Sequence, residues 1–156
     1  MSNTSSRSRP RWPWLAAGAV FALDQWTKAR LVAALTPGQS LPVLPPLLHL
    51  TYVQNTGAAF GMLRGRQALF MVLSVAVIAW IAREMLLRRH RPTVLWGCAL
   101  VLGGAAGNLV DRARLGYVID FLQLPLWPVF NVADSAITIG VALLVLQTMF
   151  WDKAAS

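Results

Sequence analysis

The chain has 156 residues, of which 56% are hydrophobic and only 13% are charged. An ordinary soluble domain has roughly 25% charged residues, so this composition excludes a disordered chain, a coiled coil and a typical soluble enzyme. It predicts a small integral membrane protein with one domain spanning residues 1–156. The net charge of +8 would suit a nucleic-acid-binding protein. However, the basic residues lie in short clusters between apolar segments, as in membrane proteins, so no nucleic-acid partner is expected.

Four apolar segments each have about the 17–25 residues needed to cross the hydrocarbon core as a helix. They are predicted transmembrane helices at about residues 12–35, 67–87, 93–110 and 132–151. The first follows a basic start like that of a signal peptide, but no Ala-x-Ala-like cleavage site comes directly after its apolar stretch. We therefore interpret it as a retained helix. The connecting segments 36–66 and 111–131 then lie together on one side of the membrane.

The basic residues predict which side that is, because cytoplasmic loops are enriched in Lys and Arg. The shortest connection carries the cluster Arg88, Arg89 and Arg91. We therefore expect both termini to be cytoplasmic and the segments 36–66 and 111–131 to be outside.

The outer segments carry patterns typical of strands. Leu48–Gln54 alternates in the manner of a half-buried strand, and Gly116–Leu124 is a second strand-like run. The two can pair into a small sheet on the helix ends. Thr36–Pro46 is rich in Pro and Gly, which predicts irregular structure and makes it a candidate lid over a site.

Four acidic residues fall on the outer side or near outer helix ends: Asp24, Asp111, Asp120 and Asp134. A carboxylate at bilayer depth costs at least about 2.5–3.5 kcal/mol on insertion scales, so each one needs a reason. Lys28 follows Asp24 by four residues on the same helical face, which favours a structural ion pair. Asp111 precedes Arg112 at the predicted end of the third helix and is expected to be paired and solvated there.

Asp120 and Asp134 have no obvious local cation. A turn through the intervening prolines can bring them together, and Asn131 is well placed as the N-cap of the fourth helix. Two adjacent carboxyl groups share a proton, because both cannot ionise cheaply. The charged one can take a proton from water, while the neutral one donates to a carbonyl oxygen. Spacing alone leaves open a structural alternative, with one carboxylate at a helix N-terminus and one in water at a strand end.

The third predicted helix carries a polar stripe of Gly104, Asn108 and Arg112, which share one face. Gly103 and Gly107 form a GxxxG pattern that allows another helix to approach closely. Asn108 and Arg112 exceed what packing needs and are candidates to hold a polar ligand or to orient the carboxylates.

Other chemistries fit less well. The two histidines stand alone and no HExxH motif occurs, so a zinc protease is not expected. Cys98 lies within an apolar run and is interpreted as a core residue rather than a nucleophile. The sequence therefore predicts no metal and no other cofactor.

Five motifs, taken together and in order, resemble those of the bacterial lipoprotein signal peptidases, the signal peptidase II family. They are Asp24–Lys28, Asn55–Gly61, Gly103–Arg112, Tyr117–Phe121 and Phe130–Ala136. The resemblance covers about residues 14–151, nearly the whole chain. The stretch Phe121–Ala133 is shorter than in many members of the family. Local substrate contacts can therefore differ here, but both flanking motifs are intact.

The resemblance implies an aspartic endopeptidase of the bacterial cytoplasmic membrane that removes the signal peptide from prolipoproteins. Cleavage comes just before a cysteine already modified with diacylglycerol. The implied fold has four transmembrane helices with a small sheet and a lid-like segment on the outer side, where the active site lies. The implied partners are diacylglyceryl-modified prolipoproteins, membrane lipids and globomycin-type inhibitors.

The resemblance also implies roles for individual residues. Asp120 and Asp134 are similar to the catalytic pair of the family, while Asp24 and Lys28 match a first-helix pair that is expected to be structural. The positions that match the surroundings of the active site are Asn55, Gly57, Gly104, Asn108, Arg112 and Asn131.

Two alternatives remain on the sequence alone. A small transporter or assembly factor could use Asp24 and Asp134 for proton or cation handling, but a transporter would predict internal repeats and paired broken helices, which we do not find in the sequence. A catalytically idle lipid-binding relative is the other alternative. The presence of both Asp120 and Asp134 argues against it, and an activity assay decides.

Overall fold

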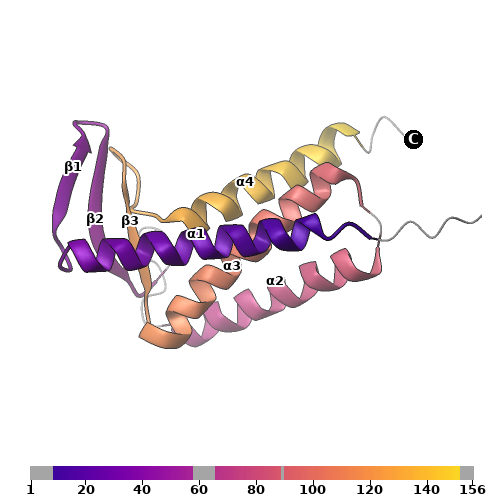
Figure 1. Cartoon of the computed structure of the whole chain (residues 1–156), viewed down its shortest axis with the longest axis horizontal. Coiled ribbons are helices and arrows are strands. Elements are labelled where there is room, and N and C mark those ends of the chain that lie inside the picture. The colour runs from indigo at the N-terminus through magenta and orange to yellow at the C-terminus, as the bar shows by residue number, and fades with distance from the viewer. Residues whose placement is uncertain (1–8, 58–65, 89, 152–156) are drawn as a thin grey trace, which may run out of the picture.

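The computed structural model describes residues 9–57, 66–88 and 90–151. These residues form a helical bundle with a small sheet at one end (Figure 1). The helices are α1 (Trp12–Ala34), α2 (Gln67–Leu87), α3 (Pro92–Leu115) and α4 (Val132–Leu146), followed by a π-helical segment, η2 (Gln147–Trp151). The strands are β1 (Ser40–Leu44), β2 (Leu48–Asn55) and β3 (Val118–Gln123). The prediction of a mainly helical fold with a small sheet is confirmed.

Helix α3 lies at the centre of the bundle and contacts α1, α2 and α4. Its apolar stretch is 61% buried, against 11% for α2 and 22% for the α4 segment. Glycines make the close packing possible. A Cβ atom at Gly103 would lie 2.5 Å from the carbonyl oxygen of Ala17 in α1, and one at Gly104 would lie 2.5 Å from that of Ala133 in α4. The polar stripe of α3 is therefore held close to both neighbouring helices.

Within the described part of the chain, three helical segments are long and apolar enough to cross a membrane. They are α2, α3 and Val132–Phe150, which combines α4 with most of η2. Helix α1 is not among them, although it packs against α3 and α4 (Figure 1). Its second half carries Asp24, Gln25, Lys28 and Arg30, which lower its apolar character.

The sheet has the order β1-β2-β3, and both pairs are antiparallel. The strands predicted at Leu48–Gln54 and Gly116–Leu124 correspond to β2 and β3. The prediction that Thr36–Pro46 is irregular is wrong, because β1 lies within it. An edge strand tolerates proline, since only one side of it needs hydrogen bonds, and Gly38 makes the preceding turn with a φ of 85°.

Two predicted helix ends also differ from the structure. Helix α3 does not end at residue 110 but continues to Leu115, where Gly116 ends it in a left-handed conformation with a φ of 78°. Asp111 and Arg112 therefore lie in the helix and not in an outer loop. The regular α-helix at the end of the chain stops at Leu146, and the predicted remainder to residue 151 is η2.

The apolar residues form two separate core clusters. One contains Ala17, Ile81, Met85 and Cys98 in the helical bundle, so the prediction that Cys98 is a core residue is confirmed. The other joins the end of α1 to the sheet through residues such as Leu31 and Ile119. Along α1, the stretch between these two clusters contains the buried polar residues described below.

We predict that Gly103→Ala destabilises the protein and that the matched change Gly18→Ala does not. A Cβ at position 103 meets the backbone of α1, and such overpacking costs about 1–3 kcal/mol. Nothing lies within 4 Å of a Cβ at Gly18, where alanine favours the helix by about 0.5–1 kcal/mol. Thermal unfolding in detergent measures the stability of both variants. Equal melting temperatures for the two variants would contradict the close packing of α1 on α3.

Candidate active site

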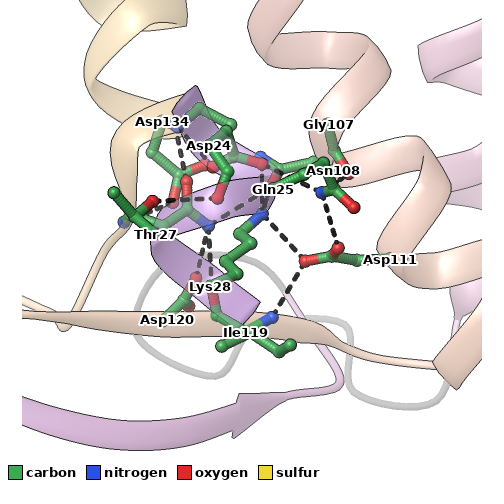
Figure 2. A network of polar contacts seen from close by, with 12 residues as sticks. Asp24, Gln25, Thr27, Lys28, Gly107, Asn108, Asp111, Ile119, Asp120 and Asp134 are labelled. Carbon is green, nitrogen blue, oxygen red and sulfur yellow. Dashed lines mark hydrogen bonds and ion pairs between the residues drawn. The ribbon is translucent and has the colours of Figure 1, made fainter. Parts of the chain in front are cut away.

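A buried lysine is the centre of a polar network between the helices (Figure 2). The Nζ atom of Lys28 lies 2.8 Å from Asp24 Oδ2 and 2.8 Å from Asp111 Oδ2, and it donates to Asn108 Oδ1 at 3.1 Å. The side chain is 2% exposed. An ammonium group has three N–H donors, and these three partners can satisfy all of them. The ion pair with Asp24 that the sequence spacing favours is present.

Asp24 links α1 to the start of α4. Its Oδ1 accepts a hydrogen bond from the backbone N–H of Ala133 at 2.9 Å, one of the N–H groups at a helix N-terminus that lack a partner within the helix. Gly107 leaves the necessary room, because a Cβ at that position would collide with the Asp24 carboxylate. Gln25 completes this side of the network by donating from Nε2 to Asp24 at 3.2 Å and to Asp111 at 3.0 Å.

Asp111 is buried, so the prediction that it is solvated is wrong, whereas the prediction that it is paired is confirmed, with Lys28 as its partner. It is 3% exposed and forms its ion pair with Lys28. Because α3 continues beyond it, its side chain faces α1 and the sheet instead of water. Its Oδ2 also accepts the backbone N–H of Ile119 at 3.2 Å, which ties α3 to β3.

Asn108 connects the lysine network to Asp134. Its Oδ1 accepts from Lys28 and also from Asn131 Nδ2 at 3.2 Å. This leaves its Nδ2 to donate to Asp134 Oδ1 at 2.7 Å. The lysine therefore fixes the orientation of the amide, which in turn presents a donor to the carboxylate.

Asn131 contacts both of the predicted catalytic aspartates. It is fully buried, and its Nδ2 donates to Asp120 Oδ1 at 2.7 Å. As the predicted N-cap of α4, it accepts the backbone N–H of Asp134 at 2.8 Å on its side-chain oxygen, while its own backbone N–H donates to Asp134 Oδ2 at 3.3 Å. This reciprocal capping box fixes the first turn of α4. The two carboxyl groups are thus bridged by one residue.

Asn55 holds the other oxygen of Asp120. It lies at the end of β2, which pairs with β3 so that Val53 is opposite Asp120. Its Nδ2 donates to Asp120 Oδ2 at 2.7 Å, and its Oδ1 accepts the backbone N–H of Gly57 at 2.9 Å. Gly57 thereby fixes which end of the amide faces the carboxylate. Residues 58–61, the rest of this predicted motif, lie outside the described residues.

The surroundings of Asp120 favour its neutral form. The residue is 1% exposed. Burial, followed by the nearby Asp134 carboxylate, raises its pKa from 3.8 to about 7, although the hydrogen bonds from Asn55 and Asn131 act in the opposite direction. A carboxyl group with this pKa can be protonated or ionised near neutral pH.

Asp120 and Asp134 line one cavity of about 550 Å³. This volume lies in the range of small-ligand sites, about 300–1,000 Å³. Its polar lining also includes Asn55, Gly57 and Arg112, and its apolar lining includes Trp127, Phe130 and Ile137. The cavity therefore offers two carboxyl groups beside a largely apolar wall.

Arg112 and Gly104 occupy different places on the α3 stripe. The Arg112 guanidinium lies 5.0 Å from the ring centroid of Phe70 in α2, and its buried Nε has no hydrogen-bond partner among the described residues. Gly104 does not line the described cavity but packs against α4 near Ala133. It therefore supports the site through helix packing.

The predicted lid at Thr36–Pro46 is an ordered edge of the sheet, where β1 pairs with β2. The described lining of the cavity contains none of its residues. Among the described residues, no group of three or more His, Cys, Asp or Glu side chains is arranged to hold a metal ion.

Sequence reasoning missed several members of the network. Gln25 lies inside the first motif, next to Asp24, so its position was a usable signal. Phe70 and the backbone N–H groups of Ile119 and Ala133 carry no such signal, because their roles depend only on how distant segments pack.

We predict that Lys28→Met strongly destabilises the protein, whereas Arg30→Gln does not. Removing Lys28 leaves two buried carboxylates without their cation, and breaking a buried pair in this way costs about 3–5 kcal/mol. Arg30 is exposed on the same helix, where a change of charge costs within about 0.5 kcal/mol. Thermal unfolding in detergent compares them. Equal melting temperatures of the Lys28→Met and Arg30→Gln variants would refute the central role of Lys28 in stability.

The chain is similar to known proteins over most of its length. The family model for signal peptidase (SPase) II matches residues 16–150. The chain is 46% identical over 134 residues to the lipoprotein signal peptidase of Halothermothrix orenii, covering 86% of this chain and 92% of that one. It is 47% identical over 136 residues to that of Moorella thermoacetica, covering 86% and 91%.

A solved bacterial membrane enzyme superposes with a TM-score of 0.84 at 30% identity, covering 88% of this chain and 87% of that one. A second such structure gives a TM-score of 0.81, also at 30% identity, and covers 89% and 93%. Both the sequence similarity and the fold thus extend over most of the chain. The chain belongs to the signal peptidase II family of aspartic proteases, which remove the signal peptide from prolipoproteins.

Proposed function

We propose that Asp120 and Asp134 are the catalytic pair of this protease. One observation carries the proposal: both carboxyl groups line the same cavity and are bridged by the buried Asn131. The pKa of Asp120, raised to about 7, lets the pair hold one shared proton near neutral pH. A singly protonated pair of carboxyl groups supplies both the base and the acid that amide hydrolysis requires.

In the proposed reaction, the ionised carboxylate takes a proton from a water molecule as the water oxygen attacks the scissile carbonyl carbon. The neutral carboxyl group donates its hydrogen bond to the carbonyl oxygen, which becomes a hydroxyl in the tetrahedral intermediate. When the C–N bond breaks, one carboxyl group gives its proton to the amine nitrogen of the lipid-modified cysteine. A hydroxyl group of the intermediate returns its proton to the other carboxylate and becomes the carbonyl of the carboxylic acid product. Cleavage therefore comes just before that cysteine, and the pair returns to its singly protonated state.

The surrounding amides act as positioning residues in this proposal. Asn55 holds Asp120 and Asn108 holds Asp134, each at 2.7 Å, while Lys28 fixes Asn108 from behind. Arg112 lines the cavity and carries an unpartnered Nε among the described residues. We assign it to hold a carbonyl or ester oxygen of the substrate, because guanidinium N–H groups only donate.

All four helices cross the bacterial inner membrane in this proposal, with both termini cytoplasmic and the site near the outer face. Large apolar side chains of α2, such as Val72 and Trp80, are exposed and suit contact with lipid. The start of α1 and the α2–α3 connection lie at the end of the bundle opposite the sheet (Figure 1). That end carries Arg88 and Arg91, which supports its cytoplasmic placement.

This placement gives the substrate a direct route. The apolar signal helix of the prolipoprotein enters between the helices from the lipid, and its diacylglyceryl chains stay in the bilayer. The apolar wall of the cavity faces the same substrate. Globomycin-type inhibitors then bind by occupying this cavity.

We expect Asp120→Asn and Asp134→Asn each to lower cleavage of a diacylglyceryl-modified prolipoprotein at least about 100-fold, because each removes one half of the acid–base pair. Purified protein in detergent, with and without globomycin, provides the assay. Glu84→Gln is the control, since Glu84 lies far along α2 among basic residues. Full cleavage by either folded Asn variant would refute the assignment of Asp120 and Asp134 as the catalytic pair. A folded wild type that does not cleave the substrate would indicate a catalytically inactive member of the family.

We expect the cleavage rate to fall above about pH 7, where the pair loses its shared proton. The hydrogen bond from Asn55 lowers the pKa of Asp120, so Asn55→Ala should raise that pKa and move the falling limb to higher pH. A pH–rate profile of kcat/KM measures the shift, which belongs to the coupled pair. Gln54→Ala, at the exposed neighbouring position, should leave the limb in place. If the falling limb of the profile stayed in place or moved to lower pH in Asn55→Ala, the proposed effect of Asn55 on the pKa of Asp120 would be contradicted.

A further inference from the structure

A second cavity lies at the opposite end of the bundle from the sheet, between the start of α1, the end of α2 and the start of α3. Its volume is about 360 Å³, and its lining includes Arg9, Arg11, Arg88 and His90. The proposed reaction uses none of these residues. Its basic lining distinguishes it from the aspartate-lined cavity at the other end.

The charges around this cavity are strongly unbalanced. Its described lining contains no carboxylate. Glu84, nearby on α2, is already engaged by Arg88 Nε at 3.2 Å and by Arg83 Nη1 at 3.4 Å. The buried Nε2 of His90 lies 3.8 Å from Glu84 Oε2, beyond hydrogen-bond distance. Arg11 forms no ion pair with a described residue. The cavity therefore has unused donors and excess positive charge.

The structure also orders part of this basic lining. Arg9 Nη2 donates to the carbonyl oxygen of Leu87 at 3.1 Å, at the end of α2 where a cation is favoured by the helix dipole. The rings of Trp12 and Trp96 pack at an angle of 42° with centroids 4.6 Å apart, which joins the start of α1 to α3. The arginines thus extend from a packed junction of helices.

The rest of the cavity is apolar and continues onto the exposed surface of the bundle. Trp14 and Leu86 line it and are 38% and 54% exposed. Leu15, beside Trp14 in the chain, is 72% exposed. A free phosphate ion would use only the arginines, whereas a phospholipid would place its phosphate among them and an acyl chain along these apolar side chains.

We propose that this cavity binds the headgroup phosphate of an anionic phospholipid in the cytoplasmic leaflet. Basic pockets between helices on the cytoplasmic side are the usual sites for such headgroups. The proposal rests on the membrane placement given above but not on the peptidase reaction. The bound lipid would hold α1 against the α2–α3 connection at the end remote from the active site.

Native mass spectrometry of the full chain, released from detergent with added phosphatidylglycerol or phosphatidylcholine, tests this directly. We expect phosphatidylglycerol to bind in preference. Arg11→Gln and Arg88→Gln should each weaken its binding about fivefold, with little effect on phosphatidylcholine. Arg11→Lys keeps the charge and should retain most of the binding. Arg30→Gln, an exposed arginine near the outer end of α1, is the matched control and should bind as the wild type does.

Three results would overturn the proposal. They are equal binding of the two lipids, an equal loss in Arg30→Gln, and full competition by inorganic phosphate, which would assign the cavity to the free ion. Asp120→Asn should bind phosphatidylglycerol like the wild type. Failure of the catalytic proposal would therefore leave this result unchanged, and the two proposals can be judged separately.

Discussion

The structure depends above all on burying the charge of Lys28. An ammonium group removed from water carries a penalty of several kcal/mol that only close, well-oriented partners offset. Those partners come from α1 itself and from α3, and Asn108 and Asp24 extend the network to the start of α4. The charge can be satisfied only when the three helices are in their observed arrangement. The small residues of α3 allow that arrangement, since side chains at Gly103 or Gly107 would displace α1.

The network also keeps the cation out of direct contact with Asp120 and Asp134, the proposed catalytic pair. Lys28 makes its ion pairs with Asp24 and Asp111, and it reaches Asp134 only through the amide of Asn108. A direct ion pair would lower the pKa of its partner and hold it ionised. Amide donors orient a carboxylate with a weaker effect on its protonation. This division explains how a protein with a fully buried lysine retains an aspartate whose pKa is raised to about 7.

Much of the fold follows from the sequence, and the failures have identifiable causes. The apolar segments predicted the helices, and alternation predicted β2 and β3, because these patterns are local. The edge strand β1 was missed because proline-rich composition indicates irregular structure unless the pairing partner is known. The end of α3 was placed too early because Asp111 and Arg112 interrupt the apolar pattern. In the structure, Asp111 is compensated by a lysine on another helix.

The sequence by itself determined the class of protein, its helical segments and the order of the motifs that carry its polar residues. It also predicted Asn131 as the N-cap of α4, because an N-cap is a local property of the sequence. Only the tertiary structure decided that Asn131 bridges both aspartates, that Lys28 has three partners and that Asp111 is buried. Lys28 and Asn108 are 80 positions apart, and Asp24 and Ala133 are 109 apart. Helical periodicity relates residues within a few turns, so contacts over such separations arise only when the helices pack.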